Sequence, residues 1–249
     1  MNIASGVNML PISAIMMGRM ETIYPTLIWD HDTAILVDTG YPGQVPLIKE
    51  QVERAGLTFE RLTKIIITHQ DLDHIGSLPA ILKELPHKAE VLADKVEAPY
   101  IQGEAHLLKV TPESIEQALK ALPAEVPEEW RAAFRKTLEN PPKANVDVII
   151  TDGQELPYCG GIIVIGTPGH TPGHISLYHK ASKTLIAADA LVVENDQLLG
   201  PTPQYCLDPD TAKQSIKKLT QYDINTVICY HGGLYSDHVN ARILELAAE

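Results

Sequence analysis

Residues 68–76, THQDLDHIG, constrain this chain most strongly, because two histidines and two aspartates stand there directly after the apolar run KIII. The apolar run predicts a buried strand, and the chain must turn where that strand ends. The alternate side chains His69, Asp71 and Asp73 can then face one point, while His74 projects from the next turn. Imidazole and carboxylate groups bind zinc-like divalent ions at about 2.0–2.2 Å. The block predicts a metal site for up to two ions rather than a hydrogen-bonded polar turn.

Three more metal-binding groups are expected at the ends of later apolar runs. His170 follows IIVIG in a Pro- and Gly-rich loop, Asp189 interrupts an apolar strand end in AADAL, and His231 follows TVICY. Gly232 and Gly233 come next and allow close approach of the backbone. Strand ends that share one sheet edge would bring all these groups into one site.

The pattern of short β-rich runs and helical periods predicts an α/β fold with helix-covered sheets. Asp208 and Asp210 are candidate caps for a helix that follows them. Residues 98–143 interrupt the pattern with two helical periods, at 111–122 and 127–140, and are interpreted as a helical insertion in a single domain, 1–249. The remaining expected strands are 24–29, 33–38, 64–68, 147–150, 162–166, 175–179, 184–188 and 226–230, and the remaining helices are 45–55, 76–85, 210–221 and 236–248.

The charge composition limits the kinds of molecule that the protein is expected to bind. The chain carries 20 basic and 32 acidic residues, a net charge of −12, which disfavours nucleic acid and anionic membrane surfaces. No apolar run reaches the ~20 residues of a membrane span, and residues 1–20 are interpreted as containing a first strand, not a signal peptide. The three cysteines lack C-x-x-C spacing and are expected to be buried thiols. We therefore expect a cytoplasmic protein acting on a small molecule.

The ordered motifs LVDTG at 36–40, the block at 69–74, GHTPGH at 169–174, AADAL and YHGG resemble the metallo-β-lactamase-fold hydrolase superfamily. The resemblance implies a four-layer αββα sandwich with two divalent metal ions in a cleft at one edge. It also implies the ligands: His69, Asp71 and His170 on the first ion, Asp73, His74 and His231 on the second, and Asp189 bridging both. Asp73 and Asp189 are further expected to act in catalysis, by moving a proton to the leaving atom.

Asp71 departs from the family pattern, because the second histidine of His-x-His-x-Asp-His normally stands at this position. A carboxylate is harder than imidazole, so zinc is expected first but iron or manganese gains at this site. The alternative is that Asp71 binds no ion and lies beside a weakly occupied first site.

Supporting roles are expected for two further residues. His174 is interpreted as a neighbour of the ligands, not a ligand. Asp38 resembles the buried acid that holds the metal-binding loop, with a turn cap as the alternative. The other histidines lack a ligand context and are expected to be surface or structural: His31, His87, His106, His179 and His238.

The compact layout resembles N-acyl homoserine lactone lactonases, which implies cleavage of a lactone or carboxylic ester. A thioester hydrolase of the glyoxalase II type, a mono-iron sulfur dioxygenase and a non-catalytic metal sensor remain alternatives. The apolar residues of the insertion could wall an acyl chain, form an ordinary core, or pair two copies of the chain in a homodimer: Tyr100, Leu107, Leu108, Trp130 and Phe134.

Overall fold

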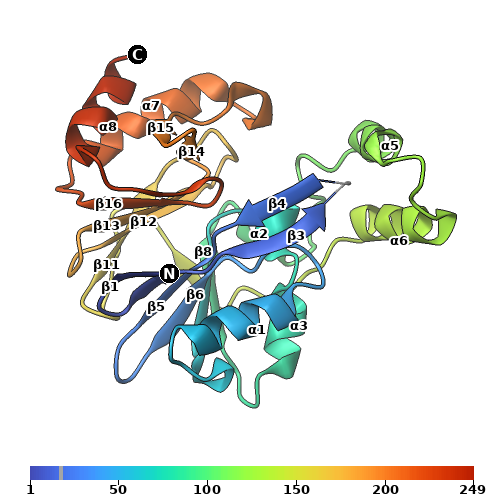
Figure 1. Ribbon diagram of the computed structural model, residues 1–249, viewed down its shortest axis with the longest axis horizontal. Helices are drawn as coiled ribbons and strands as arrows, with labels where there is room; N and C mark the ends of the chain where they lie inside the picture. Colours follow the sequence, from blue (N-terminus) through green and yellow to red (C-terminus); the bar gives the residue numbers. More distant parts are fainter. Residues whose placement is uncertain (17–18) are drawn as a thin grey trace.

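The computed structural model describes residues 1–16 and 19–249, and two β-sheets packed face to face form its centre (Figure 1). In the described residues, the first sheet has the order β1-β2-β5-β6-β7-β8-β9. Its inner strands β6, β7 and β8 run parallel, with Val37 opposite Ile66. The strands are β1 Asn2–Ala4, β2 Val7–Met9, β5 Thr26–Trp29, β6 Ala34–Val37, β7 Lys64–Ile67, β8 Glu90–Asp94 and β9 Val148–Ile150.

The second sheet has the order β10-β11-β12-β13-β16-β17 across the described residues. Strands β13 and β16 are parallel, so their carboxyl ends lie at the same edge. The strands are β10 Glu155–Leu156, β11 Ile162–Gly166, β12 Ile175–His179, β13 Thr184–Ala188, β16 Thr226–Cys229 and β17 Gly233–Tyr235. Two hairpins lie outside the sheets: β3 Ile12–Met16 with β4 Arg19–Ile23, and β14 Val192–Glu194 with β15 Gln197–Leu199.

Helices cover both outer faces of the sandwich (Figure 1). Strand β6 shows how the layers are specified. Ala34 and Leu36 pack in a core cluster with α1 (Val45–Arg54) and α3 (Leu78–Glu84), while Ile35 and Val37 pack against the second sheet. Such alternation is the period-two pattern of a strand buried on both faces.

On the far side, the second sheet packs against α7 (Pro209–Leu219) and α8 (Val239–Ala248) through Ile216, Leu219 and Ile243. The expected α/β, four-layer αββα sandwich is therefore confirmed. Asp208 caps α7 by accepting a hydrogen bond from the Thr211 amide at 3.0 Å. Asp210 lies in the first helical turn and is not the cap.

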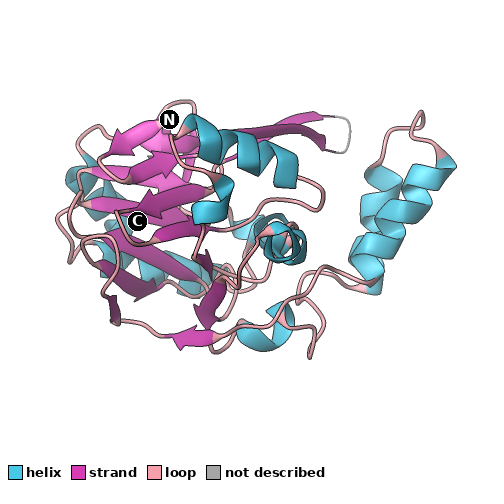
Figure 2. Cartoon of the chain, turned by 90° about the horizontal axis from the view of Figure 1, so that it is seen from below, coloured by secondary structure: helices cyan, strands magenta, loops and turns pink. Residues whose placement is uncertain are grey.

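The insertion extends away from the sandwich (Figure 2). It holds α4 (Ala98–Ile101), α5 (Pro112–Ala121) and α6 (Glu128–Glu139), close to the helices expected at 111–122 and 127–140. Its apolar side chains differ in exposure. Leu107 is buried in the core between the first sheet and helices α1 and α3, whereas Trp130 is 71% exposed. The insertion thus anchors to the body near Leu107 and leaves α6 at the surface.

Some sequence predictions were wrong in detail. The helix expected at 76–85 begins at Leu78, because a separate turn of helix, α2 (Leu72–Ile75), precedes it. Cys206 is half-buried, whereas Cys159 and Cys229 are buried as expected. The first-strand segment holds β1, β2 and β3, and its residues 17 and 18 lie outside the described residues.

The histidines without a ligand context divide into surface and structural groups. His31 and His238 have exposed side chains, and His106 is exposed. His179 is buried and bonds with the Cys159 carbonyl at 2.5 Å. None of the helices in the described ranges is long and apolar enough to cross a membrane.

Candidate metal centre

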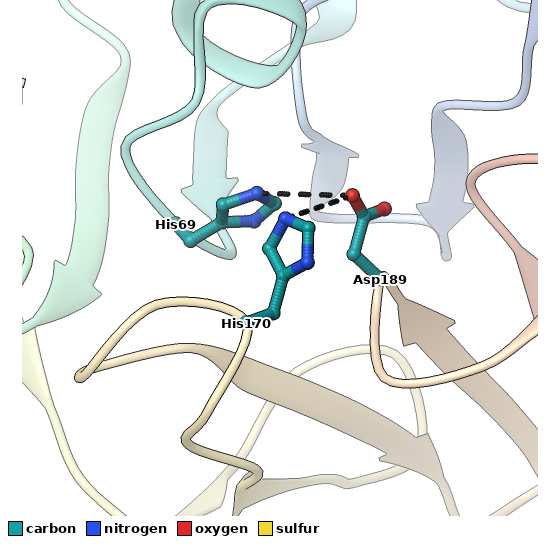
Figure 3. Close-up of side chains that lie close together, drawn as sticks. All are labelled: His69, His170 and Asp189. Carbon is teal, nitrogen blue, oxygen red and sulfur yellow. Dashed lines mark ion pairs between the residues drawn. The ribbon is translucent and has the colours of Figure 1, made fainter. Parts of the chain in front are cut away.

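The polar groups meet at the edge of the sandwich where β7, β13 and β16 end. His69 follows β7, Asp189 follows β13 and His231 follows β16. Figure 3 shows His69, His170 and Asp189 pointing toward one another from separate loops. The structure therefore collects residues distant in sequence at one edge, as the strand-end pattern predicts.

A first group contains His69, His170 and Asp189, whose metal-binding atoms all lie within 4.8 Å of one another. The Nε2 atom of His170 lies 3.2 Å from Asp189 Oδ2. Asp71 joins this group, because its Oδ2 lies 2.9 Å from Nε2 of His170 and 3.3 Å from Nε2 of His69.

A second group contains Asp73, His74 and His231, again within 4.8 Å. Asp73 Oδ2 lies 3.2 Å from Nε2 of His231 and 3.6 Å from Nε2 of His74. Asp189 faces this group too, with its Oδ1 3.5 Å from Nε2 of His74 and its Oδ2 3.7 Å from Nε2 of His231. All seven sequence-predicted site residues are thus brought together, with Asp189 between the two groups.

These residues fit divalent ions. Buried polar atoms are normally hydrogen-bonded, yet Nε2 of His69, Nε2 of His74 and Oδ1 of Asp189 are buried and have no such partner. Two ligand atoms about 2.1 Å from a tetrahedral ion are roughly 3.4 Å apart, which matches most of the distances within both groups. An ion would satisfy the orphaned atoms.

Asp38 holds His74 in position. This residue has a positive φ of 62° and is buried at the end of β6. Its carboxylate accepts hydrogen bonds from the Thr68 amide at 2.9 Å and the Thr68 hydroxyl at 2.8 Å, and lies 2.9 Å from Nδ1 of His74. Protonation of Nδ1 leaves Nε2 free to face the site, so the geometry favours the supporting role over a turn cap.

His174 uses both ring nitrogens away from the metal-binding groups. Its Nε2 accepts a hydrogen bond from the Asp189 amide at 3.1 Å, and its Nδ1 lies 2.9 Å from the Thr167 hydroxyl. Burial, with nearby His69, holds the pKa of His174 well below its usual range, which keeps the ring neutral. His174 thus orients the backbone of Asp189, in agreement with the interpretation that it is not a ligand.

The electrostatics keep the carboxyl groups ionised. Burial alone would raise the pKa of Asp71, but His69, His170 and Lys109 hold that pKa well below its usual range. Burial likewise opposes ionisation of Asp189, and nearby histidines, His231 first, hold its pKa well below the usual range. Anionic carboxylates crowded in a buried site favour a bound cation.

Glycines set the backbone of two ligand loops. Gly169 has φ +127°, and a Cβ there would lie 2.1 Å from the Ala212 amide nitrogen, so the loop carrying His170 packs directly on α7. Gly232 has φ +88°, and a Cβ would lie 1.9 Å from the Val193 carbonyl oxygen. The expectation of close backbone approach after His231 is confirmed for Gly232.

Three residues that contact the candidate ligands or their loops were not predicted from the sequence: Lys109, Glu97 and Tyr230. Nζ of Lys109 lies 2.6 Å from Asp71 Oδ2 and 2.8 Å from Nε2 of His170. Buried Glu97 accepts hydrogen bonds from the amides of Gln70, at 2.9 Å, and Gly173, at 2.7 Å, and so ties two ligand loops together. Tyr230 stacks on His74 with ring centroids 3.8 Å apart. Lys109 and Glu97 lie outside the motifs, and Tyr230, although it directly precedes His231 in YHGG, carries no local sequence signal for stacking on a histidine of another loop.

A cavity of about 490 Å³ opens on the site. Residues from both groups line it, namely Asp71, His170, Asp189, Asp73 and His231, together with apolar side chains from the β14 region and the loop before α7. Of the insertion's described residues, Lys109 is the one that lines it. Other lining residues include Tyr41, Leu191, Val192, Pro201 and Tyr205.

A model of the metallo-beta-lactamase superfamily matches residues 21–231. The chain belongs to the metallo-beta-lactamase superfamily. It is similar to the probable metallo-hydrolase YflN of Bacillus subtilis (strain 168), with 30% identity over 210 residues, 80% of this chain and 75% of that protein. Among solved structures, the metallo-beta-lactamase family protein TTHA1429 from Thermus thermophilus matches with a TM-score of 0.70 and 25% identity, over 99% of this chain and 80% of the other.

An archaeal superfamily member, ST1585 from Sulfolobus tokodaii, shares the fold. Its structure matches with a TM-score of 0.63 and 20% identity, over 98% of this chain and 85% of that chain. The four-layer architecture therefore persists across bacterial and archaeal relatives with diverged sequences.

Proposed function

We propose that this superfamily hydrolase cleaves a lactone or carboxylic ester, an N-acyl homoserine lactone being the favoured kind of substrate, with two divalent metal ions. The observation that carries the proposal is the pair of histidine and aspartate groups sharing Asp189 beside a cavity of about 490 Å³. In the proposed site His69, Asp71 and His170 hold one ion, Asp73, His74 and His231 hold the other, and Asp189 contacts both.

Divalent ions bound at such a pair supply an acidified water and polarise a carbonyl oxygen. The chain's own carboxylates would then handle the proton. Asp73 has a side chain that is 15% exposed and lines the cavity, and its Oδ2 lies 3.2 Å from Nε2 of His231. Asp73, through its second carboxylate oxygen Oδ1, would take a proton from the attacking water and return it to the leaving alkoxide, and Asp189 is the second candidate for this transfer.

The donor set bears on metal identity. Asp71, Asp73 and Asp189 give three carboxylates against four imidazoles, a set that zinc accepts and that also suits iron or manganese. Zinc is the first choice, and Asp71 is the reason to test the other two.

The cavity also suits an ester with an apolar acyl group. Leu191, Val192 and Pro201 supply apolar surface beside the ligands. The insertion side chains that the sequence suggested as an acyl wall do not line this cavity, because Leu107 faces the core and Trp130 is exposed on α6. Any acyl group would therefore lie against the β14 side of the site.

The test is a substrate panel with metal-loaded protein: acyl homoserine lactones, simple carboxylic esters, a thioester and a phosphodiester. We expect lactone or ester cleavage, and Asp73→Asn should lower kcat by about 10²–10⁴-fold, the usual range for losing a general acid or base. Cleavage of the thioester alone would favour a glyoxalase II type of activity, and oxygen uptake with a persulfide would favour a dioxygenase. Asp189→Ala that loses its metal yet still hydrolyses would contradict the mechanism.

A further inference from the structure

We propose that Lys109 acts as a tethered cation that competes with an ion for the first group, so that the two ions bind with unequal affinity and the second group fills first. The proposal rests on the proposed function for its ion-binding groups. It assigns to Lys109, a residue of the insertion, control over how many ions the protein holds.

The Lys109 ammonium lies between two side chains of the first group, Asp71 and His170. Nζ lies 2.6 Å from Asp71 Oδ2 and 2.8 Å from Nε2 of His170, and those two atoms are 2.9 Å apart. Two electron-rich atoms at that separation need a shared cation or proton. An ammonium has three donors and no acceptor, so it can donate to both atoms at once. These are the atoms that an ion in the first group would also need.

Lys109 is held in place by its backbone. The amide of the preceding residue, Leu108, donates to Oε1 of Gln70 at 2.7 Å, and Gln70 directly follows His69. The Lys109 carbonyl accepts a hydrogen bond from the Ser114 hydroxyl at 2.9 Å, and Ser114 belongs to the capping box of α5. With its side chain 25% exposed, Lys109 differs from a freely moving surface lysine.

The second group has a different environment. Within the described residues, the ion pairs of Asp73 are with His74 and His231, which are themselves expected ligands. An imidazole can release its ring proton to solvent when an ion arrives and then offers that ion a neutral lone pair. A lysine ammonium has to be displaced and repels an arriving ion at close range. The affinities of the two groups should therefore differ.

The contact with Lys109 gives a physical reason for an aspartate, and not a histidine, at position 71. Histidine at this position would offer an ion a neutral ligand, but it would give Lys109 no anionic partner. Asp71 and Lys109 are thus a matched pair, and the sequence alternative of a weakly occupied first site follows from that pairing rather than from Asp71 alone.

The experiment measures metal binding, not turnover. Protein stripped with chelator is titrated with zinc, and in parallel with manganese, by calorimetry, and the ions retained after desalting are counted by elemental analysis. We expect wild-type protein to retain one equivalent and to bind a second at least about tenfold more weakly, a difference in the range that neighbouring groups impose on metal sites. In His231→Ala the tight equivalent should be lost.

Lys109→Met should strengthen the weaker equivalent by about tenfold or more, whereas Lys109→Arg, which keeps the charge, should leave it weak. Lys120→Met, an exposed lysine of α5 in the same insertion, is the matched control and should bind as wild type. Circular dichroism of each variant confirms that it is folded.

Two equally tight equivalents in the wild type, or an unchanged weak equivalent in Lys109→Met, would overturn the role of Lys109 and leave the proposed hydrolase standing. Unequal sites that Lys109→Met equalises, in a protein that cleaves no ester or lactone, would support the role of Lys109 and reject the proposed substrate class.

Discussion

Asp38 and His174, which lie outside both candidate metal-binding groups, orient residues of those groups through hydrogen bonds. Asp38 fixes the tautomer and direction of His74 through Nδ1, and His174 accepts the amide hydrogen bond of Asp189. Each contact can be removed without touching an expected ligand. Each therefore gives a separate test of the site.

Asp38→Asn should weaken metal binding by about 10–100-fold, because the amide no longer provides an anionic partner for Nδ1 of His74. Asparagine tolerates the positive φ of this position, so backbone strain does not confuse the result. Competition against a chromophoric chelator measures the affinity, with exposed Asp32→Asn as control. Unchanged affinity would show that Asp38 serves only the turn.

His174→Ala should lower the free energy of unfolding by about 1–3 kcal/mol, since it leaves the Asp189 amide without its acceptor in a buried site. Urea denaturation of the metal-free protein measures the loss. The control, His31→Ala, changes a side chain that is 98% exposed and should stay within about 0.5 kcal/mol of wild type. Equal stability of the two variants would show that His174 does not stabilise the Asp189 backbone.

At the scale of elements, the site exists because parallel strands end at a common edge and glycines let the next loops pass close by. Gly232 follows His231, and its Cα hydrogen faces the Val193 carbonyl of β14 where a Cβ has no room. The β14–β15 hairpin and the His231 loop therefore depend on each other for their positions.

Gly232→Ala should destabilise the fold by more than about 1 kcal/mol and also weaken metal binding, because clash and positive φ together displace His231. Gly43→Ala is the matched control: its φ of +87° is nearly the same, but nothing lies within 4 Å of a Cβ there. Chemical denaturation and chelator competition measure both effects. A Gly43→Ala loss as large as that of Gly232→Ala would mean that strain alone, not the contact with Val193, matters.

What the sequence could predict follows from the same elements. Apolar runs such as KIII end in polar residues, so strand ends and their seven expected site residues are visible as local patterns. Lys109 and Glu97 reach the ligand loops from more than 25 positions away in sequence, and no local pattern records such contacts. The helix start at Leu78 was missed because α2 precedes it as a separate turn, within the ligand block itself.

At the scale of the whole molecule, the candidate metal centre lies between the two halves of the sandwich. His69, Asp73 and His74 follow a strand of the first sheet, whereas Asp189 and His231 follow strands of the second. Ions bound between them would cross-link the two sheets at one edge, and the crowded carboxylates would repel one another less. Metal binding should thus be read out as stability of the entire fold.

Removing metal with a chelator should lower Tm, and adding zinc at 100 times its Kd should restore about 2.7 kcal/mol of stability. Differential scanning calorimetry with and without chelator measures the shift. His231→Ala should show a smaller shift than wild type, because it loses a ligand of the second group. A Tm indifferent to metal in the wild type would contradict cross-linking of the sheets.

The most direct test of metal-dependent ester or lactone hydrolysis is the activity of chelator-stripped protein as ions are returned, measured against an acyl homoserine lactone with bound metal counted in the same samples. We expect no turnover in stripped protein and turnover that rises with the metal bound per chain. Turnover that persists in excess chelator, or a fully loaded protein that opens no lactone and cleaves no ester, would contradict this expectation.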